Sequence, residues 1–167
     1  KDPIHPIPMT APSSDSWNLL VIVYSVCFFI LYLKYVVVIF VTADGANHPK
    51  EDGEHLPKLI EGEHGLRLKR LLANDVENLP MQSAIFWGAL LIQIWANASG
   101  NGKHETSALT VLVIVYTISR VAYSIFYYFA LQPFRSIVFM TALFATLATA
   151  VLTIINASQI DFGQIFP

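Results

Sequence analysis

The sequence has few charged residues and almost no cysteine. Asp, Glu, Lys and Arg make up 13% of its 167 residues, whereas a soluble domain carries about 25%. The net charge is −2, so no general basic character indicates binding to nucleic acid. Hydrophobic residues form 54% of the chain and fall in long blocks. This composition is typical of an integral membrane protein.

Disulfide and metal chemistry have little support in the sequence. Cys27 is the single cysteine and lies in an apolar run, so an intrachain disulfide or a cysteine-based zinc site is excluded. We interpret it as a packed thiol. The spacings of His48, His55 and His64 match no common pattern of metal ligands. No metal site is predicted.

Four apolar blocks are each long enough to cross a bilayer core of about 30 Å. We therefore predict an all-α integral membrane protein with a four-helix transmembrane domain over residues 16–158. A proline-rich lead-in, residues 1–15, is expected to be extended, and residues 159–167 form a tail. The four helices are expected at about 17–42, 63–96, 107–130 and 136–156.

Basic residues are distributed unequally between the two ends of this bundle. The connections after the first and third helices, together with the start of the second, hold Lys50, Lys58, Arg67, Lys69, Arg70 and Arg135. The opposite end holds only Lys1 and Lys103. By the positive-inside rule, loops 1–2 and 3–4 are expected on the cytoplasmic side. The rule does not distinguish an endomembrane such as the endoplasmic reticulum from a mitochondrial or bacterial inner membrane.

A polar stripe opens the second helix. Its members are spaced three, four and three residues apart, which places them on one helical face: Arg67, Arg70, Asn74 and Glu77. Ionisable groups in a membrane span are costly and indicate function. A helical rise of about 1.5 Å per residue places Glu77 and Arg120 at similar depth. We therefore expect Glu77 to pair with Arg120.

The third helix carries a matching aromatic stripe with Arg120 inside it. Tyr116, Arg120, Tyr123 and Tyr127 follow at spacings of four, three and four. Tyr127 is expected level with the cytoplasmic part of the stripe on the second helix. Together these residues suggest a column that binds a small zwitterion with excess negative charge, beside lipid-facing walls for an apolar co-substrate. Lys34 either snorkels to the interface or faces the bundle interior.

Three segments resemble a known family, the MAPEG proteins, which are membrane-associated proteins in eicosanoid and glutathione metabolism. The segments are Arg67-Leu-Lys-Arg-Leu-Leu-Ala-Asn-Asp-Val-Glu-Asn, Arg120-Val-Ala-Tyr with Tyr127 beyond it, and Gln132-Pro-Phe-Arg-Ser. The resemblance covers roughly residues 19–155. It is nearest to the microsomal glutathione transferase and microsomal prostaglandin E synthase members.

The resemblance implies a homotrimer that binds glutathione between neighbouring subunits near the cytoplasmic face. It implies that the peptide is held by Arg67, Arg70, Asn74 and Glu77, with Tyr127 supplied by the adjacent subunit. Arg135 resembles the arginine that stabilises the thiolate, with Tyr127 as a second hydroxyl donor. The resemblance implies that Arg120 or Arg135 lies near the thiol, so Arg120 is also a candidate catalytic residue. We favour Arg135 for stabilising the thiolate and assign Arg120 to the deeper charge network.

The function that these features predict is a membrane-bound glutathione transferase or peroxidase acting on apolar electrophiles or lipid hydroperoxides. Four positions depart from the residues seen in the family, namely Leu72, Ala73, Tyr123 and Phe139. The last three motivate an alternative, in which the chain is a non-catalytic scaffold, a lipid-binding helper or an accessory subunit of a larger membrane complex. In a third interpretation, the charges only hold helices together.

Overall fold

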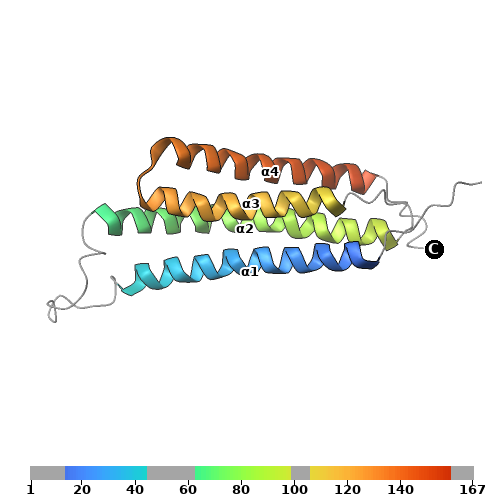
Figure 1. The fold of residues 1–167 in the computed structure, drawn as a ribbon, viewed down its shortest axis with the longest axis horizontal. Coiled ribbons are helices and arrows are strands. Elements are labelled where there is room, and N and C mark those ends of the chain that lie inside the picture. The colour runs from blue at the N-terminus through green and yellow to red at the C-terminus, as the bar shows by residue number, and fades with distance from the viewer. Residues whose placement is uncertain (1–13, 45–62, 99–105, 159–167) are drawn as a thin grey trace, which may run out of the picture.

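The structure, a computed structural model, describes residues 14–44, 63–98 and 106–158. These residues form four α-helices that run side by side along one long axis (Figure 1). The helices are α1 (Ser14–Asp44), α2 (Glu63–Ala98), α3 (Thr106–Tyr128) and α4 (Gln132–Ser158). Each is long and apolar enough to cross a membrane. The predicted four-helix membrane bundle is confirmed.

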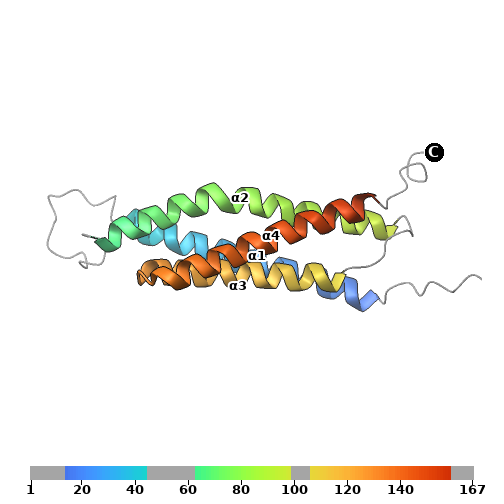
Figure 2. The same cartoon turned by 90° about the horizontal axis from the view of Figure 1, so that it is seen from above.

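Successive helices run in opposite directions, so the bundle has two distinct ends. The end of α1, the start of α2, the end of α3 and the start of α4 meet at one end (Figures 1 and 2). Helix α3 packs against α1, α2 and α4, and α2 packs against all three other helices. Large hydrophobic side chains cover the outer surface of all four helices, as expected for contact with lipid or with another copy.

The interior of the bundle contains two hydrophobic clusters. The larger joins α1, α2, α3 and α4 around the fully buried Tyr24, Phe86 and Tyr116. Cys27 belongs to this cluster and is buried, so the interpretation as a packed thiol is confirmed. The smaller cluster lies nearer the α3–α4 turn and is centred on Tyr123.

Hydroxyl side chains along α3 and α4 are compatible with the membrane because they bond to their own helix. Thr117 donates to the carbonyl of Val113 at 2.8 Å, and Thr149 donates to the carbonyl of Ala145 at 2.8 Å. Such back-bonding leaves no hydroxyl hydrogen to be satisfied by lipid.

A tight turn joins α3 to α4. The amide of Leu131 donates to the carbonyl of Phe126, and the amide of Ala130 donates to the carbonyl of Tyr127. These two bonds form a Schellman motif, in which Ala130 takes the left-handed conformation with φ of 59°. Helix α4 then starts at Gln132.

One predicted boundary at this turn was wrong, namely the start of the fourth helix. The third helix was expected to end at 130 and the fourth to begin at 136. The structure ends α3 at Tyr128 and begins α4 four residues earlier than expected, at Gln132. The reason is Pro133, which lacks an amide hydrogen and is favoured in the first turn of a helix rather than in the loop before it. The earlier start makes Arg135 part of the first turn of α4.

Candidate functional site

Three charged side chains from three helices meet inside the bundle. Asp75 on α2 contacts Arg120 on α3, with 2.7 Å between Oδ1 and Nη2, and Lys34 on α1, with 2.8 Å between Oδ2 and Nζ. The side chains of Asp75 and Arg120 are 0% exposed, and that of Lys34 is 11% exposed. We call these three residues the ion cluster. A carboxylate in this position is stabilised only because both cations lie against it.

The ion cluster corrects two sequence interpretations. Arg120 pairs with Asp75 and not with Glu77, whose side chain is exposed on the outer face of α2. Two residues along an α-helix correspond to a rotation of about 200°, so Asp75 and Glu77 point to nearly opposite sides. Lys34 faces the bundle interior, and the interpretation that it snorkels to the interface was wrong.

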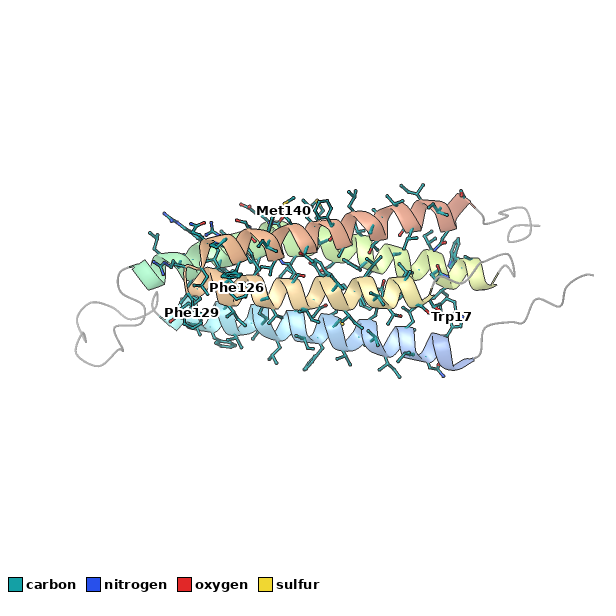
Figure 3. The ribbon with its side chains drawn as sticks, turned by 45° about the horizontal axis from the view of Figure 1, so that its top comes forward. Trp17, Phe126, Phe129 and Met140 are labelled. Carbon is teal, nitrogen blue, oxygen red and sulfur yellow. The ribbon has the colours of Figure 1, made fainter. Side chains whose placement is uncertain are left out.

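A pocket of about 430 Å³ lies between α2, α3 and α4, near the α3–α4 turn. Met140 is one of the residues that line it, and Figure 3 shows Met140 in the same half of the bundle as Phe126 and far from Trp17. The pocket combines aromatic, amide, hydroxyl and guanidinium groups, from Asn74, Tyr123, Tyr127, Arg135, Ser136, Phe139 and Met140.

Arg135 and Tyr127 form the most polar wall of this pocket. The Arg135 guanidinium lies over the Tyr127 ring, with Cζ 5.0 Å from the ring centroid. Its Nη2 atom donates to Oε1 of Gln132 at 3.1 Å, one turn back on α4. The ring and the amide hold the guanidinium in place while part of it stays exposed. A cation fixed in this way suits an anionic ligand.

Tyr123 separates the pocket from the ion cluster. Its ring lies 5.7 Å from the Tyr127 ring and 5.8 Å from the Phe139 ring, centroid to centroid. On its other side, the Cζ atom of Arg120 lies 5.4 Å from the Tyr123 ring centroid. Arg120 Nη2 also lies 3.4 Å from Oδ1 of Asn74. Arg120 therefore lies directly behind two of the pocket walls without being exposed in the pocket.

The structure brings together only some of the predicted site residues. Asn74, Tyr127 and Arg135 of one chain line the same pocket. Arg70 and Glu77 are exposed on the outer surface of α2. Arg67 is half-buried, and its Nη1 atom lies 3.5 Å from the carbonyl oxygen of Tyr128 at the end of α3. Arg120 belongs to the deep charge network that was assigned to it.

Sequence reasoning missed several residues of the interior. Asp75 and Lys34 were not among the predicted site residues, and neither was Gln82, which accepts a hydrogen bond from the Tyr116 hydroxyl at 2.9 Å. A usable signal existed on α2, where Leu68, Leu71 and Asp75 follow at spacings of three and four. That spacing puts Asp75 on the apolar face that packs into the bundle.

A second hollow lies between α1 and α2. Its volume is about 420 Å³, and its walls are mainly apolar and aromatic, with Leu31, Tyr35 and Trp87 among them. Asp75 and Pro80 also line it. Since Pro80 has no amide hydrogen, it cannot bond to the carbonyl of Val76, another wall residue. Within the described helices, no group of His, Cys, Asp and Glu is arranged to hold a metal ion.

The fold and the pocket together define a class of protein. Four membrane-spanning helices enclose a buried ion cluster, and beside it lies a pocket with an arginine stacked on a tyrosine. This is a multi-pass integral membrane protein with a site suited to a small anionic ligand.

Comparison with known proteins gives the family. The MAPEG family profile matches residues 19–155, which include all four helices except their outermost residues, and the chain belongs to this family. The predicted family is thus confirmed. The chain is accordingly a membrane protein of the class concerned with glutathione and eicosanoid metabolism. No curated protein and no solved structure matches the sequence.

Proposed function

We propose that the protein is a membrane-bound glutathione transferase or peroxidase. Glutathione would bind in the pocket between α2, α3 and α4 with its thiol near Arg135. The observation that supports this most directly is the Arg135 guanidinium held over the Tyr127 ring, 5.0 Å from its centroid, in a pocket that also contains Asn74. A peptide with two carboxylates complements such a pocket.

The chemistry depends on deprotonating the thiol. A free thiol has a pKa of about 8.5, so only a few per cent is thiolate at neutral pH, and the thiolate is the nucleophile. The positive charge of Arg135 and the hydroxyl of Tyr127 would both stabilise sulfur as an anion. The proton would pass to water at the open side of the pocket.

Two reactions follow from an activated thiolate. With an apolar electrophile, sulfur attacks carbon, a carbon–sulfur bond forms and the leaving group departs with its electron pair. With a lipid hydroperoxide, sulfur attacks the terminal oxygen, the O–O bond breaks, and an alcohol and glutathione sulfenic acid result. A second glutathione reduces the sulfenic acid, giving glutathione disulfide and water. In both cases the apolar co-substrate would arrive from the lipid.

We also propose that three chains assemble into a homotrimer with this end of the bundle on the cytoplasmic side. Arg70 and Glu77 are exposed on the surface of a single chain, at a depth where charges facing lipid are costly. A neighbouring chain would cover them and bring them to the edge of a shared site. There they could bind the charged termini of glutathione, together with Arg67. Native mass spectrometry of the detergent-solubilised protein would give the number of chains.

Steady-state kinetics on purified protein would test the proposed activity. Wild type is expected to conjugate glutathione to an aryl chloride, to reduce cumene hydroperoxide, or to do both. Arg135→Leu is expected to lose turnover by about 100-fold or more, as when one preorganised donor is removed from other sites. Arg135→Lys should keep part of the activity because it keeps the charge. If purified wild type neither turned over nor bound glutathione, the proposal would be wrong.

One observation favours a second candidate, a non-catalytic binding protein or accessory subunit. Phe139 lines the pocket beside Tyr123, with 5.8 Å between the ring centroids, and has no hydroxyl to donate to a bound thiolate. In this alternative the pocket would still bind its ligand, but without turnover. Glutathione binding by a purified trimer that has no activity, together with stoichiometric co-purification of another membrane protein, would support the second candidate over the first.

A further inference from the structure

The ion cluster carries one net positive charge. Lys34 and Arg120 are cations and Asp75 is the one carboxylate between them. Glu77, the other acidic side chain described on α2, is exposed on the outer surface. The Nε and Nη1 atoms of Arg120 are buried and have no hydrogen-bond partner among the described residues. The cluster is therefore short of one negative charge.

A net charge buried in a membrane protein is costly. An anion bound close to the ion cluster would lower this cost, and the pocket is the nearest site for one. Arg120 is separated from the pocket only by Tyr123, whose ring lies against its guanidinium, and by Asn74, which lies 3.4 Å from its Nη2 atom. Both of these residues line the pocket. An anion in the pocket is then one side-chain layer away from the Arg120 guanidinium.

We propose that an anionic ligand in the pocket completes the charge balance of the ion cluster, and that Lys34 sets the strength of this coupling. Lys34 does not touch the ligand. It neutralises Asp75 from the far side, so that the positive charge of Arg120 acts on the pocket. This inference rests on the proposed function in one respect, namely that glutathione is taken as the anion.

The size of the coupling follows from Coulomb's law. A unit charge about 10 Å from an anion, at an effective dielectric constant of about 20, changes a binding constant by about tenfold. Lys34→Met makes the cluster neutral and is expected to weaken glutathione binding about tenfold. Lys34→Arg keeps the charge and should bind as wild type. Lys69→Met removes an exposed lysine of α2 that lies outside the cluster and is the matched control.

The experiment measures binding of glutathione and of its glycine monoethyl ester, which has one negative charge fewer, to the full-length protein in detergent micelles. Wild type is expected to prefer glutathione over the ester, and Lys34→Met is expected to lose most of this preference. A purely structural role for Lys34 would lower stability without changing the ratio of the two affinities. If the preference is the same in Lys34→Met and wild type, the inference is overturned.

A second variant separates charge from position. Lys34→Met combined with Asp75→Asn leaves Arg120 alone and returns the cluster to one net positive charge. The preference for glutathione is expected to return in this double variant. If the preference stays lost in a folded double variant, the geometry of the cluster matters and its charge does not. If neither variant folds, wild type still tests the inference, because equal affinity for glutathione and its ester overturns it.

Sulfate, a small anion, separates this inference from the proposed function. Wild type and the Lys69→Met control are expected to gain thermal stability in sodium sulfate beyond any gain shown by Lys34→Met. If wild type bound no glutathione but showed this difference, the proposed function would fail and the charge inference would stand. If wild type bound glutathione but showed no difference from Lys34→Met with either anion, only the charge inference would fail.

Discussion

Asp75→Asn is expected to destabilise the protein more than any conservative substitution on the outer face of α2. The change keeps the shape of the side chain and removes its charge. Lys34 and Arg120 would then be two like charges in the interior, with side chains 11% and 0% exposed and no carboxylate between them. Breaking a buried ion pair by removing one partner costs about 3–5 kcal/mol. We expect a loss in that range.

Thermal unfolding of the purified, full-length protein in detergent is a suitable assay, followed by circular dichroism or by size-exclusion chromatography after heating. For a chain of this length, 1 kcal/mol shifts Tm by about 2–4 °C, so Asp75→Asn should lower Tm by roughly 6–20 °C. Lys69→Met is the control, because it removes an exposed charge from the same helix outside the ion cluster. Its effect should be small.

The same assay can refute the reasoning. If Lys69→Met lowered Tm as much as Asp75→Asn, the loss would not be specific to the ion cluster and the reasoning would be wrong. A further check is the double variant in which Lys34→Met accompanies Asp75→Asn. Because it removes the repulsion between the two cations, it should be more stable than Asp75→Asn alone. If the double variant were the less stable of the two, the two cations would not repel each other as proposed.

Three further predictions concern single positions. Tyr127→Phe should lower turnover about tenfold or more, because it removes a hydroxyl donor. Binding of glutathione should change little, because the ring under Arg135 is kept. Equal turnover of the variant and wild type in steady-state assays would exclude the hydroxyl from catalysis. Ala130→Gly should stabilise the protein by up to about 1 kcal/mol, because glycine adopts a positive φ without the strain of a Cβ atom. The φ of Ala130 is 59°, so an unchanged or lower Tm would contradict this turn geometry. Cys27 is buried in the core and should react with a maleimide only after the protein is unfolded in SDS. Mass spectrometry of the labelled protein measures this reaction. Rapid labelling of the native protein would contradict the buried position of Cys27.

The four helices could be predicted because their signal lies in length and composition alone. An apolar block of more than about 20 residues has few structures available to it in a membrane. The boundary between α3 and α4 could not be predicted as well, because the end of α3 depends on Ala130 adopting a conformation more typical of glycine. A positive φ at an alanine leaves no mark in the sequence.

The partner of Arg120 could not be predicted from the sequence for a different reason. Depth along a helix can be estimated from residue number, and both Asp75 and Glu77 lie at a suitable depth. Depth does not give rotation, however, and only the side of α2 that packs into the bundle decides between the two carboxylates. The polar stripe of Arg70 and Glu77 suggested an inward face, whereas in one chain this stripe faces outward. Polar residues on a membrane helix can mark a surface between subunits as well as an interior.

The candidate pocket was predicted only in part. Tyr127 and Arg135 are close in sequence and joined by a short turn, so their proximity follows from local structure. Asn74 was assigned to the site by the resemblance and lies there. Ser136 and Met140 became part of the pocket through the early start of α4 at Gln132, which was not anticipated.

The turn between α3 and α4 also has a consequence for how the protein is made. The pocket takes Asn74 from α2, Tyr127 from α3 and Arg135 from α4, so it is complete only after all four helices have entered the membrane. Until α4 packs against α2 and α3, the pocket lacks its arginine and one of its walls. A nascent chain therefore has no premature ligand site, and a chain cut short after α3 would expose a half-built one to lipid.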